Sequence, residues 1–378
     1  MPKTITWEQA TRLRLARQHL AKPVAPSRLA KVVADVCGIQ AQVLTAAELC
    51  LSARVKNLSQ ESLRRAIWDK RALVKTYGPR GTLHLLPATE LPLWMAAMRA
   101  REQQVNKAQH VGGGFNSAQA HAVVEAVGAA LDGRALSREQ LAKEAGRRLG
   151  PWAKQGLASS WGVLLAPAAY AGLLCFGPSQ GSKVTFVRAD QWAGGWKRLD
   201  EEKALRAVAL RYIAAYGPVR PQDFSRWFWL SKPAAEKLFA DLASSLTEVE
   251  FEGRRAWIAK TAKPAVSSNG DGLWLLPQYD SYTLGCVPRE HLLSEKVRQR
   301  VFSYGRGRFE GSVGLPVLLL NGQVAGLWER KASAKKLSIK VEAILKLTSA
   351  QRDLVKAEAA RIAEFYEKPL NLSFSPLD

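Results

Sequence analysis

The sequence predicts an α+β protein in which several helices followed by a two-stranded hairpin occur three times, ahead of a strand-rich C-terminal part. Stretches with helical spacing of apolar residues alternate with short runs of strand-forming residues around turns. A polar stretch at 261–271, TAKPAVSSNGD, separates the third hairpin from the tail. We therefore expect three modules, at 1–112, 113–198 and 199–262, and a β-rich subdomain with a closing helix at 272–378.

The first module is expected to contain four helices and a hairpin. The apolar spacing and turn residues predict helices from a cap at Thr4 or Thr6 to Leu20 and at 27–38, 43–55 and 60–69. Gly38 indicates a helix end or a sharp bend. Two strands around GPRG are predicted within 73–87. Helices followed by a hairpin are the order of a winged-helix motif.

The same order is expected in the next two modules. In the second, helices are predicted at 118–131, at 136–150 with Ser137 as N-cap and Gln140 completing a capping box, and at 159–172 with a bend at Pro167, before strands in LLCFG and KVTFVR. In the third, they are predicted at 201–216, near Pro221 and after Ser231, before a hairpin at 246–260.

The tail differs in composition from the repeated part. Strands are predicted in GLWLLP, LPVLLLNGQVAGLWER and KLSIKVEAI, with Asn-Gly as a tight turn. A helix at 349–366, capped by Ser349, is expected to close the chain.

Net charge is the first indication of function. Lys and Arg number 55 against 33 Asp and Glu, a formal net charge of +22 over 378 residues. This excess predicts a polyanionic partner, with nucleic acid first, an anionic membrane surface second, and a basic protein without such a partner as the alternative. We expect a cytoplasmic protein, since no apolar run approaches the length that spans a bilayer and the N-terminus lacks a signal core.

The cysteines and histidines do not suggest a metal site. Four cysteines form no CxxC pair and are interpreted as reduced core residues, and the five histidines have no zinc-ligand spacing. We therefore expect no metal and no cofactor.

Basic residues at turns are the candidates for DNA backbone contacts. The residues singled out are Arg80 and His84 in the first hairpin, Arg254 and Arg255 in the third, Arg306 and Arg308 in the segment YGRGRFEG, and Arg330 and Lys331. Residues 296–340 hold ten Lys or Arg against two acids. A solvated surface is the alternative for any one of them.

Four segments, in order, resemble the AlkZ/YcaQ-type bacterial DNA glycosylases. They are GIQAQVLTAAELCLSARV, YGPRGTLHLLPATEL, YGPVRPQDFSRWFWL and LLPQYDSYTLG. The resemblance implies tandem winged helices that form a C-shaped basic channel for double-stranded DNA, with excision of N7-alkylguanines and, in one branch, unhooking of interstrand crosslinks. It implies a monomer that acts on duplex DNA with alkylated or crosslinked purines, has no membrane partner and associates with the bacterial nucleoid.

The resemblance also implies a catalytic glutamine pair. The family's motif is glutamine–apolar–glutamine or glutamine–x–aspartate, and Gln40 and Gln42 match the first form, which belongs to the crosslink-unhooking branch. Ala41 is small for the middle position, and Val43 and Leu44 stand where Asp-Pro is common.

Amide side chains suit the excision of a base that is already cationic. N7-alkylguanine leaves without protonation, so the enzyme needs to place a water near C1′ and to stabilise an oxocarbenium-like transition state. An amide accepts from that water through its oxygen while it donates through its nitrogen. On a helix, side chains two residues apart diverge by about 200°. The two glutamines can therefore share one water only if the chain bends after Gly38. The alternative is that both amides only cap a helix end.

Asp280, in the segment LLPQYDSY, is a further catalytic candidate. A carboxylate near C1′ would stabilise the developing cation. The alternative is that Asp280 caps the loop and Tyr282 packs inside.

Two other functions remain as alternatives to a glycosylase. They are a winged-helix transcriptional regulator without catalysis and a protein that sequesters alkylated DNA without cutting it.

Overall fold

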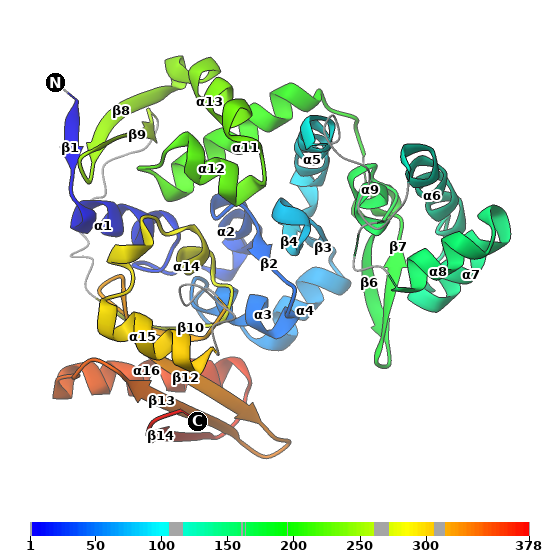
Figure 1. Ribbon diagram of the computed structural model, residues 1–378. Helices are drawn as coiled ribbons and strands as arrows, with labels where there is room; N and C mark the ends of the chain where they lie inside the picture. Colours follow the sequence, from blue (N-terminus) through cyan, green and yellow to red (C-terminus); the bar gives the residue numbers. More distant parts are fainter. Residues whose placement is uncertain are drawn as a thin grey trace. The chain divides into compact units, whose positions relative to one another are not determined.

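The computed structural model describes residues 2–105, 116–159, 162, 164–194, 196–260, 272–305 and 314–377 (Figure 1). It has the expected α+β class. The chain divides into two compact units, the first formed by Met1–Leu63, Tyr212–Arg220 and Ser244–Asp378 and the second by Arg64–Arg211 and Pro221–Ala243. The helices α4 (Gln60–Trp68) and α11 (Glu201–Tyr216) contribute residues to both.

The first unit contains two sheets. Its helices are α1 (Trp7–Arg17), α2 (Leu29–Asp35), α3 (Leu44–Ser52), α14 (Ser281–Gly285), α15 (Glu295–Tyr304) and α16 (Ser349–Phe365). Its strands are β1 (Lys3–Ile5), β2 (Ile39–Gln40), β8 (Leu246–Phe251), β9 (Arg254–Ala259), β10 (Leu273–Leu276), β11 (Val317–Leu320), β12 (Gln323–Ala332), β13 (Leu337–Ala343) and β14 (Leu370–Phe374).

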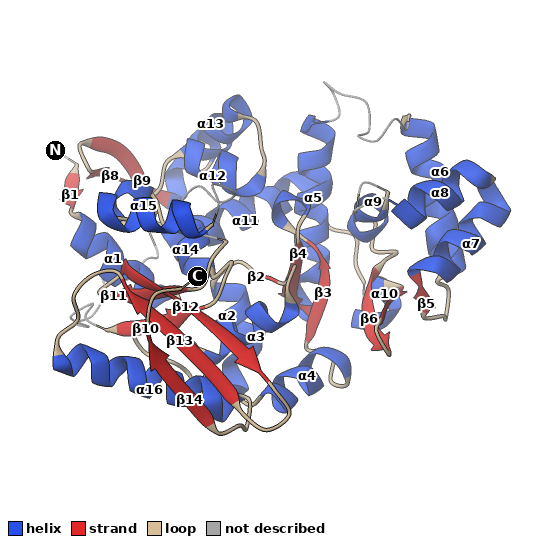
Figure 2. Ribbon diagram, turned by 60° about the horizontal axis from the view of Figure 1, so that its bottom comes forward, coloured by secondary structure: helices blue, strands red, loops and turns tan. Residues whose placement is uncertain are grey.

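The larger sheet has the order β10-β11-β12-β13-β14, and α16 contacts it along β10 and β14 (Figure 2). Neighbouring strands are antiparallel except β13 and β14. The Asn-Gly turn predicted between β11 and β12 is present, with both residues at positive φ. In the smaller sheet, β1 runs parallel to β8, which pairs with β9.

The second unit is mostly helical. Its helices are α5 (Leu91–Val105), α6 (Ser117–Ala130), α7 (Arg138–Leu149), α8 (Pro151–Ser159), α9 (Leu165–Tyr170), α10 (Ala189–Ala193), α12 (Pro221–Phe228) and α13 (Lys232–Asp241). Its strands are β3 (Leu73–Tyr77), β4 (Leu83–Pro87), β5 (Leu136–Ser137), β6 (Cys175–Gln180) and β7 (Lys183–Val187). The last three form a sheet in the order β5-β7-β6.

Local sequence signals explain most element ends. The capping box predicted for α7 is present, since Ser137 accepts from the Gln140 amide and the Gln140 side chain accepts from the Ser137 amide. The three hairpins β3–β4, β6–β7 and β8–β9 lie where they were predicted. The order of helices and then a hairpin is therefore present in each repeated part, and the tandem winged-helix arrangement stays a prediction.

Three local predictions need correction. The helix expected at 159–172 consists of the end of α8 and the separate helix α9, which has Pro167 in its first turn. The cap of α16 is Thr348 instead of Ser349, because Gln351 lies three residues after Thr348 and completes a capping box with it. Helix α5 was not predicted. Its own buried apolar residues lie on all sides of the helix, so its sequence shows little amphipathic periodicity.

The buried interior confirms the interpretation of the cysteines. All four are free and buried. None of the described helices is long and apolar enough to cross a bilayer, and the described residues contain no cluster of three or more His, Cys, Asp or Glu side chains suited to a metal ion.

Candidate active site around the glutamine pair

The glutamine pair follows a tight helix end. Cys37 and Gly38 both have positive φ, at 63° and 88°. The Gly38 amide donates to the Val33 carbonyl (2.8 Å) and the Cys37 amide to the Ala34 carbonyl (3.1 Å), the two bonds of a Schellman motif. The bend predicted at Gly38 is therefore present. It turns the chain out of α2 into the short strand β2, which ends at Gln40.

The two glutamines differ in exposure. Gln40 is only 8% exposed, Ala41 is fully buried, and Gln42 is exposed. Helix α3 begins two residues after Gln42 and buries every residue from Ala46 to Ser52. The tripeptide is thus part of a short link between two packed helices, with one amide at the edge of the protein interior and one facing solvent.

The C-terminal end of α3 is fixed by a buried ion pair. The Arg54 guanidinium donates to both Asp280 oxygens, at 2.7 and 2.8 Å, and both side chains are 0% exposed. Arg54 also donates to the Cys50 carbonyl (2.8 Å). The Asp280 carboxylate raises the pKa of Arg54 despite the opposing effect of burial, so the guanidinium stays charged.

Asp280 has the geometry of a loop cap, which was the alternative to a catalytic role. It is the N-cap of α14 and accepts from the Tyr282 amide at 2.8 Å, while the Tyr282 ring is fully buried. With its oxygens occupied by Arg54 and by this amide, the carboxylate faces the protein interior. Asp280 therefore has the contacts of a structural residue, which ties α14 to Arg54, two residues after the end of α3.

Tyr216, in the segment YGP, contacts the segment YDSYTLG and the end of α2 just before GIQAQ. Its hydroxyl donates to the Val36 carbonyl at the end of α2 (2.9 Å), and Arg14 donates to its carbonyl (2.9 Å). A Cβ at position 285 would lie 2.0 Å from the Tyr216 ring, so the close approach of the ring requires Gly285. Tyr216 thus packs the segments YGP and YDSYTLG together and holds the helix end that leads into GIQAQ.

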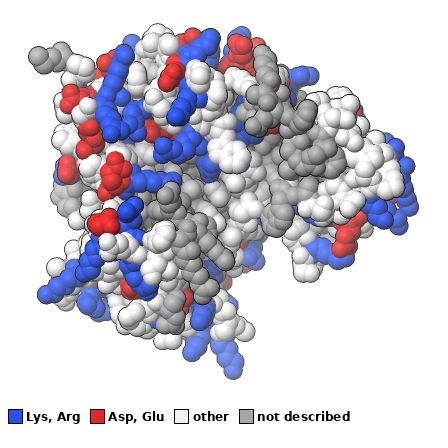
Figure 3. Space-filling model, in the orientation of Figure 1, with Lys and Arg blue, Asp and Glu red and all other residues white. Residues whose placement is uncertain are grey.

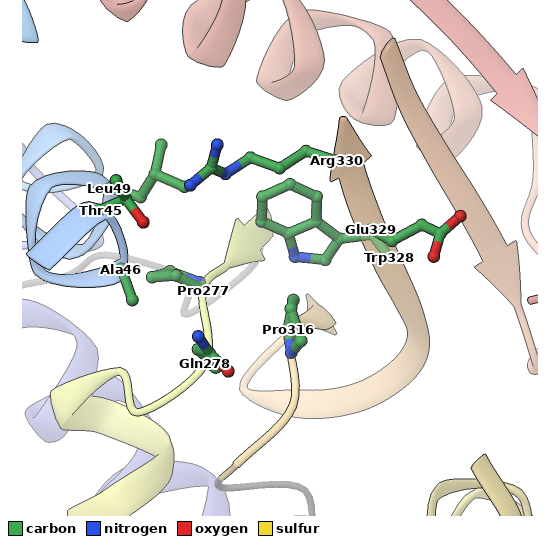
Figure 4. A pocket seen from close by; sticks show the side chains of 9 residues that line it. All are labelled: Thr45, Ala46, Leu49, Pro277, Gln278, Pro316, Trp328, Glu329 and Arg330. Atoms are coloured by element: carbon green, nitrogen blue, oxygen red, sulfur yellow. The ribbon is translucent and has the colours of Figure 1, made fainter. Parts of the chain in front are cut away.

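A cavity of about 290 Å³ lies beside the first turns of α3 (Figure 4). Its walls come from α3, the chain after β10, Pro316 and β12: Thr45, Ala46, Leu49, Pro277, Gln278, Pro316, Trp328, Glu329 and Arg330. Figure 4 shows Arg330 reaching from β12 toward Thr45 and Leu49. The Trp328 indole donates to the Leu276 carbonyl (2.8 Å) and so forms a fixed wall. Arg330 is therefore in the same unit as the glutamine pair and near the helix that follows it.

The predicted DNA-contacting residues have different environments. Lys331 and Arg254 are exposed, and Arg255 is exposed but bonds to Glu248 on the neighbouring strand. Arg330 is half-buried, with its guanidinium carbon 5.0 Å from the centroid of the Tyr366 ring. Lys and Arg side chains are spread over the face shown in Figure 3, with acidic side chains among them. Arg306 and Arg308 lie outside the described residues.

Arg80 lies in the turn between β3 and β4, and His84 is the second residue of β4. Arg80 has positive φ and donates to the Trp227 carbonyl (3.0 Å), so at least part of its guanidinium supports the fold. The His84 side chain is 3% exposed and its Nδ1 lies 3.0 Å from the Thr82 carbonyl. Burial, with Arg80 nearby, lowers the pKa of His84 to about 3, so the imidazole is neutral and Nδ1–H donates. His84 thus lies beneath the turn, away from any surface that DNA could contact directly.

Sequence reasoning missed Arg54 and Tyr216, which hold the end of α3 and the end of α2. A signal for Arg54 exists in CLSARV, where one arginine stands among apolar and small residues. An arginine in such a run indicates burial and therefore a carboxylate partner. Nothing in the sequence identifies that partner, because Asp280 lies 226 residues away.

An α+β fold, a strongly basic chain and an amide pair between packed helices fit a protein that acts on DNA. The chain belongs to the AlkZ-like DNA glycosylase family, whose sequence profile matches residues 33–365. It is 33% identical over 333 residues to an interstrand DNA cross-link repair glycosylase of Streptomyces sahachiroi, over 86% of this chain and 88% of that protein. The solved structure of Streptomyces sahachiroi DNA glycosylase AlkZ superimposes with a TM-score of 0.81 at 29% identity, covering 98% of this chain and all of that one. The family resemblance in the sequence is confirmed.

Proposed function

We propose that this DNA glycosylase hydrolyses the N-glycosidic bond of N7-alkylated purines in double-stranded DNA and unhooks interstrand crosslinks made through N7, for base-excision repair or for self-resistance to a DNA-alkylating natural product. The observation that carries the proposal is the Gln40–Ala41–Gln42 link, with one amide held in the protein and the next exposed to solvent. The name of the Streptomyces sahachiroi relative supports the crosslink substrate.

The reaction needs a positioned water more than a strong acid. An N7-alkylguanine carries a positive charge that is neutralised when the glycosidic bond breaks, so the base leaves without a proton from the enzyme. The barrier that remains is the alignment of water with C1′ and the stabilisation of the oxocarbenium-like sugar. A neutral amide serves this purpose at any physiological pH, since it does not titrate.

We assign different parts to the two amides. Gln42, being exposed, reaches the DNA and accepts a hydrogen bond from the attacking water through Oε1. Gln40, which is nearly buried on β2, is the second amide of the catalytic pair. The packed link between α2 and α3 holds its orientation. Loss of a group that positions the nucleophile typically slows such a step by about a hundredfold or more.

The basic residues near this part of the chain supply affinity. Lys331 on β12 and Arg254 on β9 are exposed cations in the same unit as the glutamine pair, and Arg330 borders the cavity beside α3. Phosphate contacts of this kind position the duplex without reading its sequence. We propose that these three residues, together with Arg255, hold the DNA backbone.

The proposal is tested with a duplex that contains one 7-methylguanine. The wild-type protein is expected to release free 7-methylguanine and to leave an alkali-labile abasic site, and an undamaged duplex of the same sequence serves as the control. A second substrate, a duplex crosslinked through guanine N7 by a nitrogen mustard, is expected to separate into single strands on a denaturing gel after incubation.

The outcomes distinguish the rival functions. Tight binding of both duplexes without base release from either would favour a DNA-binding regulator. Selective binding of alkylated DNA without release would favour sequestration. Release of 7-methylguanine with no strand separation would support glycosylase activity and reject interstrand crosslinks as a substrate.

A further inference from the structure

Trp229, in the turn between α12 and α13, is the most exposed large hydrophobic residue in the described part of the chain, at 60%. Its neighbours Trp227, Phe228 and Leu230 are all buried. Within the described residues the Trp229 indole makes no hydrogen bond and no contact with another ring. The apolar contacts of this turn are therefore made by its neighbours, and the indole faces solvent.

The backbone of Trp229 is in a conformation that disfavours a bulky side chain. Its φ is +58°, in the left-handed region. It follows the last residue of α12, and the Leu230 amide donates to the Ser225 carbonyl (3.0 Å), as in a Schellman motif. Glycine is the usual residue at this position and in the turn of a helix-turn-helix.

The turn geometry does not depend on the indole. The Ser225 hydroxyl donates to the Leu230 carbonyl (2.6 Å), so this second hydrogen bond between Ser225 and Leu230 closes the turn. Glycine would satisfy the same backbone with less strain. A tryptophan that is strained, exposed and unnecessary for the turn indicates a role outside the fold.

The surroundings of Trp229 favour a nucleic acid. Exposed Arg226 precedes it on α12, and exposed Lys232 opens α13 immediately after the Ser231 cap. In helix-turn-helix proteins the N-terminal residues of the second helix approach DNA, and the turn lies next to them. In a duplex the base faces are covered by their neighbours, so the indole can pack against an exposed sugar or a groove edge. A contact with a sugar adds affinity without sequence preference.

We propose that Trp229 is a DNA-contacting residue, whose indole packs against a nucleotide while Arg226 and Lys232 contact the phosphates beside it. The inference rests on the proposed binding of duplex DNA and adds to it a contact surface in the second unit.

The test is the variant Trp229→Gly, measured for Tm and for affinity to an undamaged duplex. The Tm is expected to equal or exceed that of the wild type, because glycine adopts positive φ without strain. The affinity is expected to fall by about tenfold, as when one well-packed aromatic contact is removed from an interface. The control is Asn57→Gly, at another exposed position with positive φ (52°), which is expected to leave the affinity unchanged.

Two results would overturn the inference. A lower Tm for Trp229→Gly would show that the indole supports the fold, and an unchanged affinity would show that it does not contact DNA. The variant Trp229→Phe, which keeps an aromatic face, is expected to retain more affinity than Trp229→Gly, and equal losses would also contradict an aromatic contact with DNA. Failure of the wild-type protein to bind duplex DNA would instead reject the proposed function.

Discussion

Replacing Asp280 with asparagine separates a structural from a catalytic role of this carboxylate. Asparagine keeps the size of the side chain and an oxygen that accepts from the Tyr282 amide. It removes the negative charge that the Arg54 guanidinium contacts at 2.7 and 2.8 Å. Since Arg54 is 0% exposed, the substitution leaves a buried cation without a counter-charge.

The expected cost is large because neither partner reaches solvent. Removal of one partner of a buried ion pair typically destabilises a protein by about 3–5 kcal/mol. With an unfolding entropy of about 2.1 cal/mol/K per residue over this chain, a loss of about 4 kcal/mol lowers Tm by about 5 °C. The excision rate per folded molecule should stay near the wild-type value.

The assay combines thermal unfolding with single-turnover release of 7-methylguanine at a temperature where both proteins are folded. A suitable control is Asp353→Asn on α16, which breaks an exposed i,i+3 pair with Lys356 and is expected to change Tm by less than about 1 °C. The reasoning is refuted if Asp280→Asn keeps the wild-type Tm and DNA affinity while base release slows by about tenfold or more, on the order of 1.4 kcal/mol.

Three further predictions concern DNA binding and pH. Affinity for duplex DNA is expected to fall linearly with salt on logarithmic axes, with a slope equivalent to several released counterions, and a flat titration would contradict the electrostatic account. Arg330→Ala and Lys331→Ala should weaken binding to damaged and undamaged duplex about equally, and a loss confined to damaged DNA would exclude a backbone role. Because the pKa of His84 is lowered to about 3, its contribution to stability is complete above about pH 6.5 and is lost as the pH falls, by about 2 kcal/mol at pH 5. Urea unfolding at pH 7 and 5 should show this loss in the wild type and not in His84→Phe, and equal losses in both would reject it.

Local signals in the sequence predicted much of the fold. The capping box at Ser137 and Gln140 and the Asn-Gly turn depend on residues within four positions of one another, so a single sequence shows them. The bend at Gly38 is of the same kind. The cap at Thr348 could also have been predicted, since Gln351 lies three residues after Thr348, the spacing of a capping box, and only two after Ser349.

Contacts between residues far apart in the chain could not be predicted from the sequence. The chemistry of Asp280 depends on Arg54, 226 residues earlier, and the close approach that requires Gly285 depends on Tyr216. His84 follows a predicted turn and was expected at the surface, but the fold covers it. Burial of a polar residue is a property of the assembled structure, so local patterns cannot decide whether such a residue contacts a ligand or supports the fold.

The most direct test of the account is the single-turnover rate of 7-methylguanine release by Gln42→Ala. Because Gln42 is exposed, the variant should keep the wild-type Tm and nearly the wild-type affinity for damaged duplex. The account predicts that base release slows by about a hundredfold or more, since the attacking water loses the amide that positions it. A variant that binds normally and releases the base at the wild-type rate would contradict the assignment of the glutamine pair as the catalytic centre.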